Sequence, residues 1–390
     1  MKVLILLLCC LLSGCAIQPP AETVAEVTVA VPATTETVPT VPPETTMPAA
    51  VPLPTEAADP IREIISSLSL RERVGQLFLA RCDSSVALED LETYHLGGFV
   101  LFGQDFQGQT PDSLRQKLAA YQAAGRLPLL IAVDEEGGTV TRVSSNPAFR
   151  ASKFPSPRNA YAQSGMEGAV SLELEKSRFL VDLGINVNLG PVCDITTDPS
   201  AFMYSRSLGQ DVLVTSKFIT RTVDVMSQAG IGSCLKHFPG YGNNTDTHVG
   251  MATDSRSLTE LEFADLLPFT AGIAAGCDAI LVSHTIIEAL DPQSPASLSP
   301  AVHSYLRNEM RFGGVIVTDD LAMQAITHRY GAGEAAVQAV LAGNDLLCAS
   351  DYRTQFDAVY AAVLDGRIDI DTLNSAVRNV LEWKTELGLI

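Results

Sequence analysis

The stretch that decides the fold reads QAGIGSCLKH, residues 228–237. Its first residues are the end of an amphipathic segment, and Gly230 follows them. A short apolar run, Gly232–Lys236, comes next and is followed by His237. Glycine adopts left-handed backbone at little cost, so Gly230 predicts a helix end. A short apolar run between turn residues is typical of a strand buried on both faces. The stretch therefore predicts a helix, a stop and a buried strand with polar residues at its carboxyl end.

The same pattern recurs along the rest of the chain. Eight apolar runs are predicted as strands: Gln76–Ala80, Gly98–Phe102, Leu129–Val133, Val187–Leu189, Gly232–Lys236, Ala279–Ser283, Val315–Thr318 and Asp345–Cys348. Helices are predicted at Asp112–Ala124 (with Thr110 as cap and Pro111 in the first turn), Val212–Gln228, Leu258–Ala275, Ala301–Glu309, Glu334–Leu341, Phe356–Leu364 and Leu373–Leu387. Glycine stops are predicted at Gly125, Gly184, Gly230, Gly276 and Gly343.

Strands that alternate with helices indicate a parallel sheet, and eight of them favour a closed (β/α)8 TIM barrel of the α/β class. The alternative is an open doubly wound sheet. No G-x-G-x-x-G follows an early strand, which removes the commonest nucleotide-binding form of that alternative. We predict one domain over residues 59–390.

The amino-terminal segment predicts an anchored, extracytoplasmic protein. The apolar run Val3–Leu12 is too short to span a bilayer, which takes about 20 residues, and it resembles a signal-peptide core. It ends in LSGC, residues 12–15, which resembles a bacterial lipobox. We expect a signal peptide over residues 1–14 and a lipid on Cys15, which would attach the protein to the outside of the cell membrane. The alternative is an ordinary secretory signal with an incidental cysteine.

Residues 15–58 are predicted to be a tether. Nine of the 22 prolines lie between Pro19 and Pro54, a density that prevents both helix and sheet. The formal net charge of −19 argues against nucleic acid as a partner and against attachment to an anionic membrane surface by charge. The five cysteines after Cys15 contain no C-x-x-C, so we expect small buried side chains and neither a disulfide framework nor a metal site.

Polar residues follow several of the predicted strands. In a barrel of this kind catalytic groups lie where strands end and the following loops begin. The residues at those positions are Asp134 with Glu135, Glu136, Gly137 and Gly138, then Asp194, Lys236, His237, His284, Asp319 and Asp320. A single carboxylate there could simply cap the next helix. Several of them at one end of a barrel predict an active site.

Six short motifs, in order, resemble glycoside hydrolase family 3, and in particular its single-domain β-N-acetylhexosaminidases of the NagZ type. They are VDEEGG (133–138) with Arg142, NLGPVCD (188–194), RSLG (206–209), KHFPG (236–240), DTH (246–248) and VTDDL (317–321). The resemblance implies a retaining exo-β-N-acetylglucosaminidase that removes terminal GlcNAc from peptidoglycan fragments or related oligosaccharides. It implies no metal and no cofactor, and we expect a monomer.

By this resemblance Asp319 is the nucleophile, and His248 is the acid/base, paired with Asp246. A histidine titrates near ~6.5, so it can give and take a proton near neutrality. A carboxylate on its other ring nitrogen would fix the tautomer and support the charged form. Retaining chemistry places the acid/base only ~5–5.5 Å from the nucleophile.

The resemblance also implies which residues hold the sugar hydroxyls: Asp134, Arg142, Arg206, Lys236 and His237. His237 is expected to donate to the sugar. For Lys236 the alternative is an ion pair with a neighbouring Asp. Asp320 and Asp194 are expected to support the site without reacting.

The chain departs from the family pattern at Tyr241, where a His is common, at Thr139, where an Arg is frequent, and in a loop over 242–246 that is one residue short.

A β-glucosidase or β-xylosidase is the nearest rival function, and phosphate stays open as an alternative acceptor to water. A non-catalytic, lipid-anchored sugar-binding protein is an alternative of another class. A metal-dependent amidohydrolase barrel is disfavoured because its first strand carries H-x-H, whereas Phe78–Cys82 does not.

Overall fold

The computed structural model describes residues 59–196, 198–242 and 250–390. The predicted signal peptide, Cys15, the tether through residue 58, and both Asp246 and His248 lie outside the described residues. The statements made about them above therefore stay predictions. Within the described residues, no helix is both long and apolar enough to cross a membrane.

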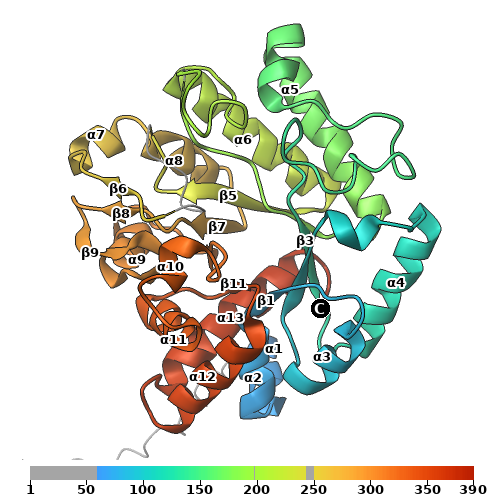
Figure 1. Cartoon of the computed structure of the whole chain (residues 1–390), viewed down its shortest axis with the longest axis vertical. Coiled ribbons are helices and arrows are strands. Elements are labelled where there is room, and N and C mark those ends of the chain that lie inside the picture. Colours follow the sequence, from blue (N-terminus) through green and yellow to red (C-terminus); the bar gives the residue numbers. More distant parts are fainter. Residues whose placement is uncertain (1–58, 197, 243–249) are drawn as a thin grey trace, which may run out of the picture. The chain divides into compact units, whose positions relative to one another are not determined.

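Eight parallel strands form a nearly closed barrel (Figure 1). They are β1 (Phe78–Arg81), β2 (Gly98–Leu101), β3 (Leu130–Val133), β4 (Val187–Asn188), β5 (Gly232–Phe238), β7 (Ala279–Val282), β10 (Val315–Thr318) and β11 (Leu347–Ala349). Their order is β10-β7-β5-β4-β3-β2-β1-β11. The two end strands meet at a parallel bridge between Val317 and Leu346, where the Thr318 amide donates to the Leu346 carbonyl over 3.1 Å. The predicted (β/α)8 barrel is confirmed.

The helices flank these strands (Figure 1). They are α1 (Pro60–Ser67), α2 (Leu70–Gln76), α3 (Ala87–Tyr94), α4 (Pro111–Ala124), α5 (Pro157–Asp182), α6 (Val212–Ala229), α7 (Leu258–Glu262), α8 (Leu266–Ala274), α9 (Pro300–Ser304), α10 (Gln324–Thr327), α11 (Ala332–Ala342), α12 (Tyr352–Leu364) and α13 (Ile370–Glu386). Single turns lie at η1 (Gly103–Phe106), η2 (Ala296–Leu298) and the π-helical η3 (Tyr305–Glu309). A small separate sheet joins β6 (Thr253–Asp254), β8 (Ile286–Ile287) and β9 (Asp291–Pro295).

All eight predicted strands overlap observed ones, and the errors lie at their ends. Gln76 closes helix α2, so the first strand begins at Phe78. The last strand begins at Leu347 and not at Asp345. The Asp345 carboxylate accepts from the Ile316 amide at 2.8 Å and from Asn379 Nδ2 at 2.7 Å, so this side chain bonds to neighbouring elements beside the barrel wall.

The predicted helices show two kinds of error. The segment predicted over 258–275 breaks into α7 and α8, and the one predicted over 301–309 is α9 followed by η3. Gly125 has a φ of −66° and is not a left-handed stop, whereas Gly230 (φ 75°) and Gly343 (φ 110°) are. The cap of α4 is confirmed, since the Ser113 amide donates to Thr110 Oγ1 at 3.2 Å.

The carboxy-terminal helix α13 closes the amino-terminal end of the barrel. Trp383 packs with the barrel-lining side chains Leu130, Val187 and Cys234, and a Cβ at Gly232 would lie only 3.0 Å from its ring. The next residue, Lys384, is buried and its Nζ donates to Gln76 Oε1 at 2.7 Å. With this end filled, the carboxyl ends of the strands are where a substrate can enter.

Candidate active site

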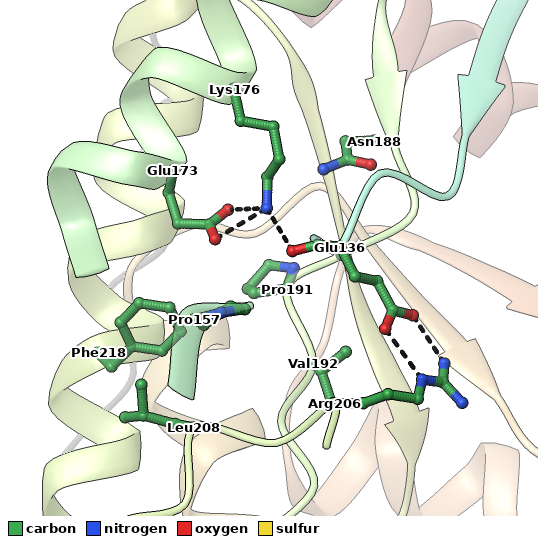
Figure 2. A pocket seen from close by; sticks show the side chains of 11 residues that line it. Glu136, Pro157, Glu173, Lys176, Asn188, Pro191, Val192, Arg206, Leu208 and Phe218 are labelled. Atoms are coloured by element: carbon green, nitrogen blue, oxygen red, sulfur yellow. Dashed lines mark hydrogen bonds and ion pairs between the residues drawn. The ribbon is translucent and has the colours of Figure 1, made fainter. Parts of the chain in front are cut away.

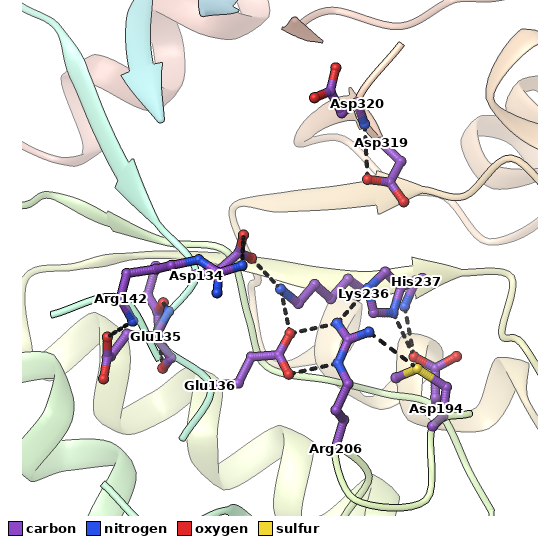
Figure 3. Close-up of polar contacts among 12 residues, drawn as sticks. Asp134, Glu135, Glu136, Arg142, Asp194, Arg206, Lys236, His237, Asp319 and Asp320 are labelled. Atoms are coloured by element: carbon purple, nitrogen blue, oxygen red, sulfur yellow. Dashed lines mark hydrogen bonds and ion pairs between the residues drawn. The ribbon is translucent and has the colours of Figure 1, made fainter. Parts of the chain in front are cut away.

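A pocket of about 580 Å³ lies at the carboxyl ends of the strands, within the range usual for ligand sites. Its lining comprises Arg81, Val100, Phe102, Asp134, Thr139, Val140, Arg142, Leu189, Phe202, Ser205, Arg206, Lys236, His237, Leu281, Asp319, Asp320, Met323 and Cys348. Every described residue that was predicted to react with or hold the sugar is in this set, whereas Asp194 and His284, which also follow strands, are not. The chain thus brings Asp134, Arg142, Arg206, Lys236, His237 and Asp319 together at one barrel end (Figure 3).

Glu136 joins Arg206 and Lys236 of this lining in one polar network, although it is not itself in the lining (Figure 3). Its carboxylate accepts two hydrogen bonds from Arg206, at 2.9 Å from Nε and 2.7 Å from Nη2. The same carboxylate lies 2.8 Å from Lys236 Nζ. A bidentate guanidinium–carboxylate pair is both strong and directional, so Glu136 fixes the orientation of Arg206 and links two elements, the loop after β4 and strand β5.

The charges in this network are stabilised in the ionised state. Burial alone would raise the pKa of Glu136, but Lys236 and Arg206 outweigh it and hold that pKa well below its ordinary value. Burial would lower the pKa of Lys236, but Asp134 and Glu136 outweigh it and raise the pKa. The pKa of Arg206 is likewise raised, because Glu136 more than offsets its burial. Neutral pH therefore leaves all three groups charged.

Asp134 and Lys236 form the ion pair that was the alternative prediction for Lys236. Lys236 Nζ donates to Asp134 Oδ1 at 2.6 Å, and the other Asp134 oxygen lies 3.8 Å from Arg142 Nη2. The Lys236 side chain is 2% exposed and that of Asp134 is 21% exposed. Asp134 is thus the more accessible of the two groups to a ligand, with Lys236 behind it.

His237 is held by a partner at each ring nitrogen. Its Nδ1 lies 2.8 Å from Asp194 Oδ2, which also accepts from the His237 amide at 3.1 Å. Its Nε2 lies 3.1 Å from Arg206 Nη2. Arginine has donors only, so Nε2 must accept and the proton must be on Nδ1. In this arrangement neither ring nitrogen is a donor toward the pocket, and the role of His237 as a donor to the sugar stays a prediction.

Tyr241 is buried beside this pair. Its amide donates to Asp194 Oδ1 at 2.7 Å, so Asp194 accepts from both ends of the segment 237–241. The Tyr241 ring meets the His237 ring edge-on at 5.3 Å between centroids and the Phe202 ring at 5.6 Å. The departure from the family pattern at Tyr241 thus places an aromatic ring in the packing under the pocket.

Asp319 begins the loop after β10, apart from the Glu136 network (Figure 3). Its amide donates to the Val282 carbonyl at 3.0 Å, and its Oδ1 accepts from the Asp320 amide at 2.9 Å. The Asp320 carboxylate accepts from the Ser350 amide at 3.1 Å and from the Ser350 hydroxyl. The Asp320 carbonyl lies 2.9 Å from His284 Nε2. Asp320 and His284 therefore fix the backbone around Asp319, and neither was assigned that contact from sequence.

Glu135 organises the loop that carries Arg142. Its carboxylate accepts from the amides of Arg142 and Val143, each at 2.8 Å, and from the Ser144 hydroxyl. Sequence reasoning gave no role to Glu135 or to Glu136. Three consecutive acidic residues at the end of a buried strand were the signal that could have found both.

A buried pair on α5 supports the backbone of this loop (Figure 2). Lys176 Nζ donates to the Glu136 carbonyl at 2.9 Å and pairs with Glu173 at 2.7 Å. Burial raises the pKa of Glu173, although Lys176 opposes the shift. This pair lines a small void whose other walls include Pro191 and Arg206 (Figure 2).

The five cysteines in the described part of the chain are all free. Four are buried, and burial raises the pKa of Cys82 to about 12. Cys348 is half-buried and lines the pocket near Asp319, so the expectation of small buried side chains is wrong for this residue.

The chain is similar to several characterised proteins. A beta-hexosaminidase, LpqI, from Mycobacterium tuberculosis is 30% identical over 349 residues, which cover 86% of this chain and 88% of that protein. A beta-hexosaminidase from Stenotrophomonas maltophilia is 34% identical over 75% of this chain and 86% of its own length. Among solved structures, a glycoside hydrolase family 3 beta-N-acetylglucosaminidase from Paenibacillus sp. superposes with a TM-score of 0.78 at 32% identity; it matches 83% of this chain, which spans 63% of that longer protein.

The structure of M. tuberculosis LpqI superposes with a TM-score of 0.75 at 28% identity, over 85% of this chain and 98% of its own. The domain described as "Glycosyl hydrolase family 3 N terminal domain" matches residues 69–383, which is most of the chain. The protein therefore belongs to glycosyl hydrolase family 3.

Proposed function

We propose that this protein is a retaining exo-β-N-acetylglucosaminidase that releases terminal β-linked GlcNAc from peptidoglycan fragments or related oligosaccharides. The observation that carries the proposal is one pocket lined by Asp319, which directly follows β10, and by Asp134, Lys236 and Arg206, the last two of which pair with Glu136. The names of its relatives, beta-hexosaminidases and a beta-N-acetylglucosaminidase, support the same activity.

Asp319 acts as the nucleophile. Its carboxylate attacks the anomeric carbon, the bond to the leaving oxygen breaks, and a covalent glycosyl-enzyme forms. His248, oriented by Asp246, gives its proton to the leaving oxygen and then takes one from the incoming water. The contacts made by the Asp320 backbone keep the Asp319 carboxylate in place for the attack.

The network opposite Asp319 holds the sugar. Asp134 is accessible, accepts from sugar hydroxyls and positions Arg142, which donates. Two of the three Lys236 donors are taken by Asp134 and Glu136, so one is left for a hydroxyl. Arg206 is mostly occupied by Glu136 and His237, so its main task is to position those two groups.

A lipid anchor on Cys15 would place this activity outside the cell membrane, at the end of the tether over residues 15–58. Labelling with a radioactive fatty acid tests this. The full-length protein should take up label and partition with membranes, and Cys15→Ala should do neither. Equal labelling of the two proteins would disprove the anchor.

Kinetics on aryl glycosides test the activity. We expect kcat/KM for the β-N-acetylglucosaminide to exceed that for the β-glucoside and β-xyloside by at least about 100-fold. A pocket that hydrogen-bonds the N-acetyl group of GlcNAc can supply a preference of this size over sugars that lack the group. A preference for glucoside or xyloside would favour the rival function. Sugar binding without turnover would favour the non-catalytic alternative. Adding phosphate and identifying the released sugar decides between water and phosphate as acceptor.

A further inference from the structure

A second pocket, of about 440 Å³, adjoins the active site and has no place in the reaction described above. We call it the basic side pocket; it is formed by Lys153, Phe154, Arg158, Asn159 and Tyr204, with neighbouring backbone. It shares two exposed residues, Thr139 and Ser205, with the lining of the active-site pocket. The two pockets therefore meet at one rim.

The charge of the basic side pocket is opposite to that of the chain. The protein has 45 acidic and 26 basic residues, yet this lining contains two cations and no carboxylate. Lys153 is exposed, and no carboxylate of the described residues lies within ion-pair distance of it. A pair of cations without an acidic neighbour favours an anionic ligand.

Arg158 is fixed in place before any ligand arrives. Its Nη2 donates to the Thr196 carbonyl and to Ser207 Oγ, each at 3.0 Å. Its guanidinium lies over the Tyr204 ring, 3.7 Å from the centroid. Nη1 makes no hydrogen bond to the described residues, so its two donors stay available. A preorganised guanidinium loses little entropy when it binds an anion.

The position of the pocket indicates which part of a substrate would reach it. The pocket lies on the loops after β3 and β4, and along the sheet two strands, β5 and β7, separate β4 from β10. With the anomeric carbon at Asp319, we place the opposite edge of the sugar, which carries O4 and O6, toward the β3 and β4 loops. A group attached to that edge would enter the basic side pocket, whereas the leaving group would not.

We infer that the basic side pocket binds an anionic substituent, a phosphate or a carboxylate-bearing group, on the non-reducing edge of the terminal sugar. O6 is the more suitable attachment point, because its exocyclic carbon gives the substituent extra reach. This inference rests on the proposed function and adds a substrate class to it: terminal GlcNAc residues that carry a negative charge opposite the scissile bond.

Two aryl β-N-acetylglucosaminides test it, one unsubstituted and one with a 6-O-phosphate. We expect the wild-type protein to hydrolyse the phosphorylated glycoside with a kcat/KM at least equal to that of the unsubstituted one. Lys153→Gln should lower kcat/KM for the phosphorylated glycoside about tenfold, the value of one charge-assisted hydrogen bond, and leave the unsubstituted one within twofold.

Lys217→Gln, on the exposed face of α6, is the matched control and should change neither value. A 6-O-methyl glycoside separates charge from bulk, and it should not share the sensitivity to Lys153→Gln. A 6-O-phosphate that abolishes hydrolysis, or a Lys153→Gln effect equal on both glycosides, would overturn the inference. Failure to hydrolyse the unsubstituted glycoside would instead overturn the proposed function.

Discussion

Replacing Glu136 by Gln should destabilise the protein more than any surface substitution, although the shape of the side chain is kept. The Glu136 carboxylate is 3% exposed and lies within 2.9 Å of donors from both Arg206 and Lys236. Asp134 would still pair with Lys236, but Arg206 would lose its bidentate partner. Removal of one member of a buried ion pair costs about 3–5 kcal/mol, a large part of the 5–15 kcal/mol that stabilises a typical domain.

The pH dependence of this loss follows from the lowered pKa of Glu136. The unfolded carboxyl titrates near 4.5 and the folded one well below it, so the stabilisation is complete above 4.5 and declines as the pH falls further. The difference in free energy of unfolding between wild type and Glu136→Gln should therefore be full at pH 7 and smaller at pH 3.5.

Urea unfolding followed by the fluorescence of Trp383, the only tryptophan of the chain, measures both values. Glu175→Gln is the matched control, because Glu175 is exposed and its pair with Arg150 contributes less than about 1 kcal/mol. A Glu136→Gln protein within 1 kcal/mol of wild type at pH 7, or a gap that widens in acid, would refute the reasoning.

Three further predictions concern other sites. Asp319→Asn should lower kcat/KM for the aryl N-acetylglucosaminide by about 1000-fold or more while urea stability changes little, and near-normal turnover would remove Asp319 from the mechanism. Lys384→Met should raise the free energy of unfolding at pH 7, because burial lowers the pKa of Lys384 from 10.5 to about 7. The wild type should therefore gain stability as the pH rises from 7 toward 10.5, by at most about 5 kcal/mol, whereas the variant should not. A variant with the same pH dependence as wild type would contradict this. Lys176→Met should destabilise the protein by about 3–5 kcal/mol by leaving Glu173 buried without its cation, and a variant as stable as wild type in urea would show that this pair is dispensable.

The barrel could be predicted because its strands are short apolar runs and several helices end in glycine. That pattern depends on local sequence, as at Gly230 and strand β5. Helix α5 was missed because Gly165 (φ 63°) interrupts its backbone pattern and because Glu173 and Lys176 are charged residues on its buried face. The start of α2 could have been found, since Ser69 and Glu72 form a capping box.

Part of the site could also be predicted from local sequence, because its polar residues lie at or near the carboxyl ends of the apolar runs. Asp134 and Asp319 directly follow strands and Lys236 lies near the carboxyl end of β5, so their meeting at one end of the barrel follows from the fold. The role of Glu136 could not be predicted in this way, because it depends on contacts with Arg206 from a distant loop and with Lys236 from β5. The acceptor role of His237 likewise depends on Arg206, whose approach only the tertiary structure shows.

The central claim is that Asp319 becomes glycosylated during turnover. A slow fluorinated GlcNAc glycoside, followed by proteolysis and mass spectrometry, tests it most directly. We predict that the mass of one sugar is added to the peptide that contains Asp319, and that Asp319→Asn shows no such addition. An adduct on another residue, or an active enzyme in which the released sugar has inverted configuration at its anomeric carbon, would contradict the account.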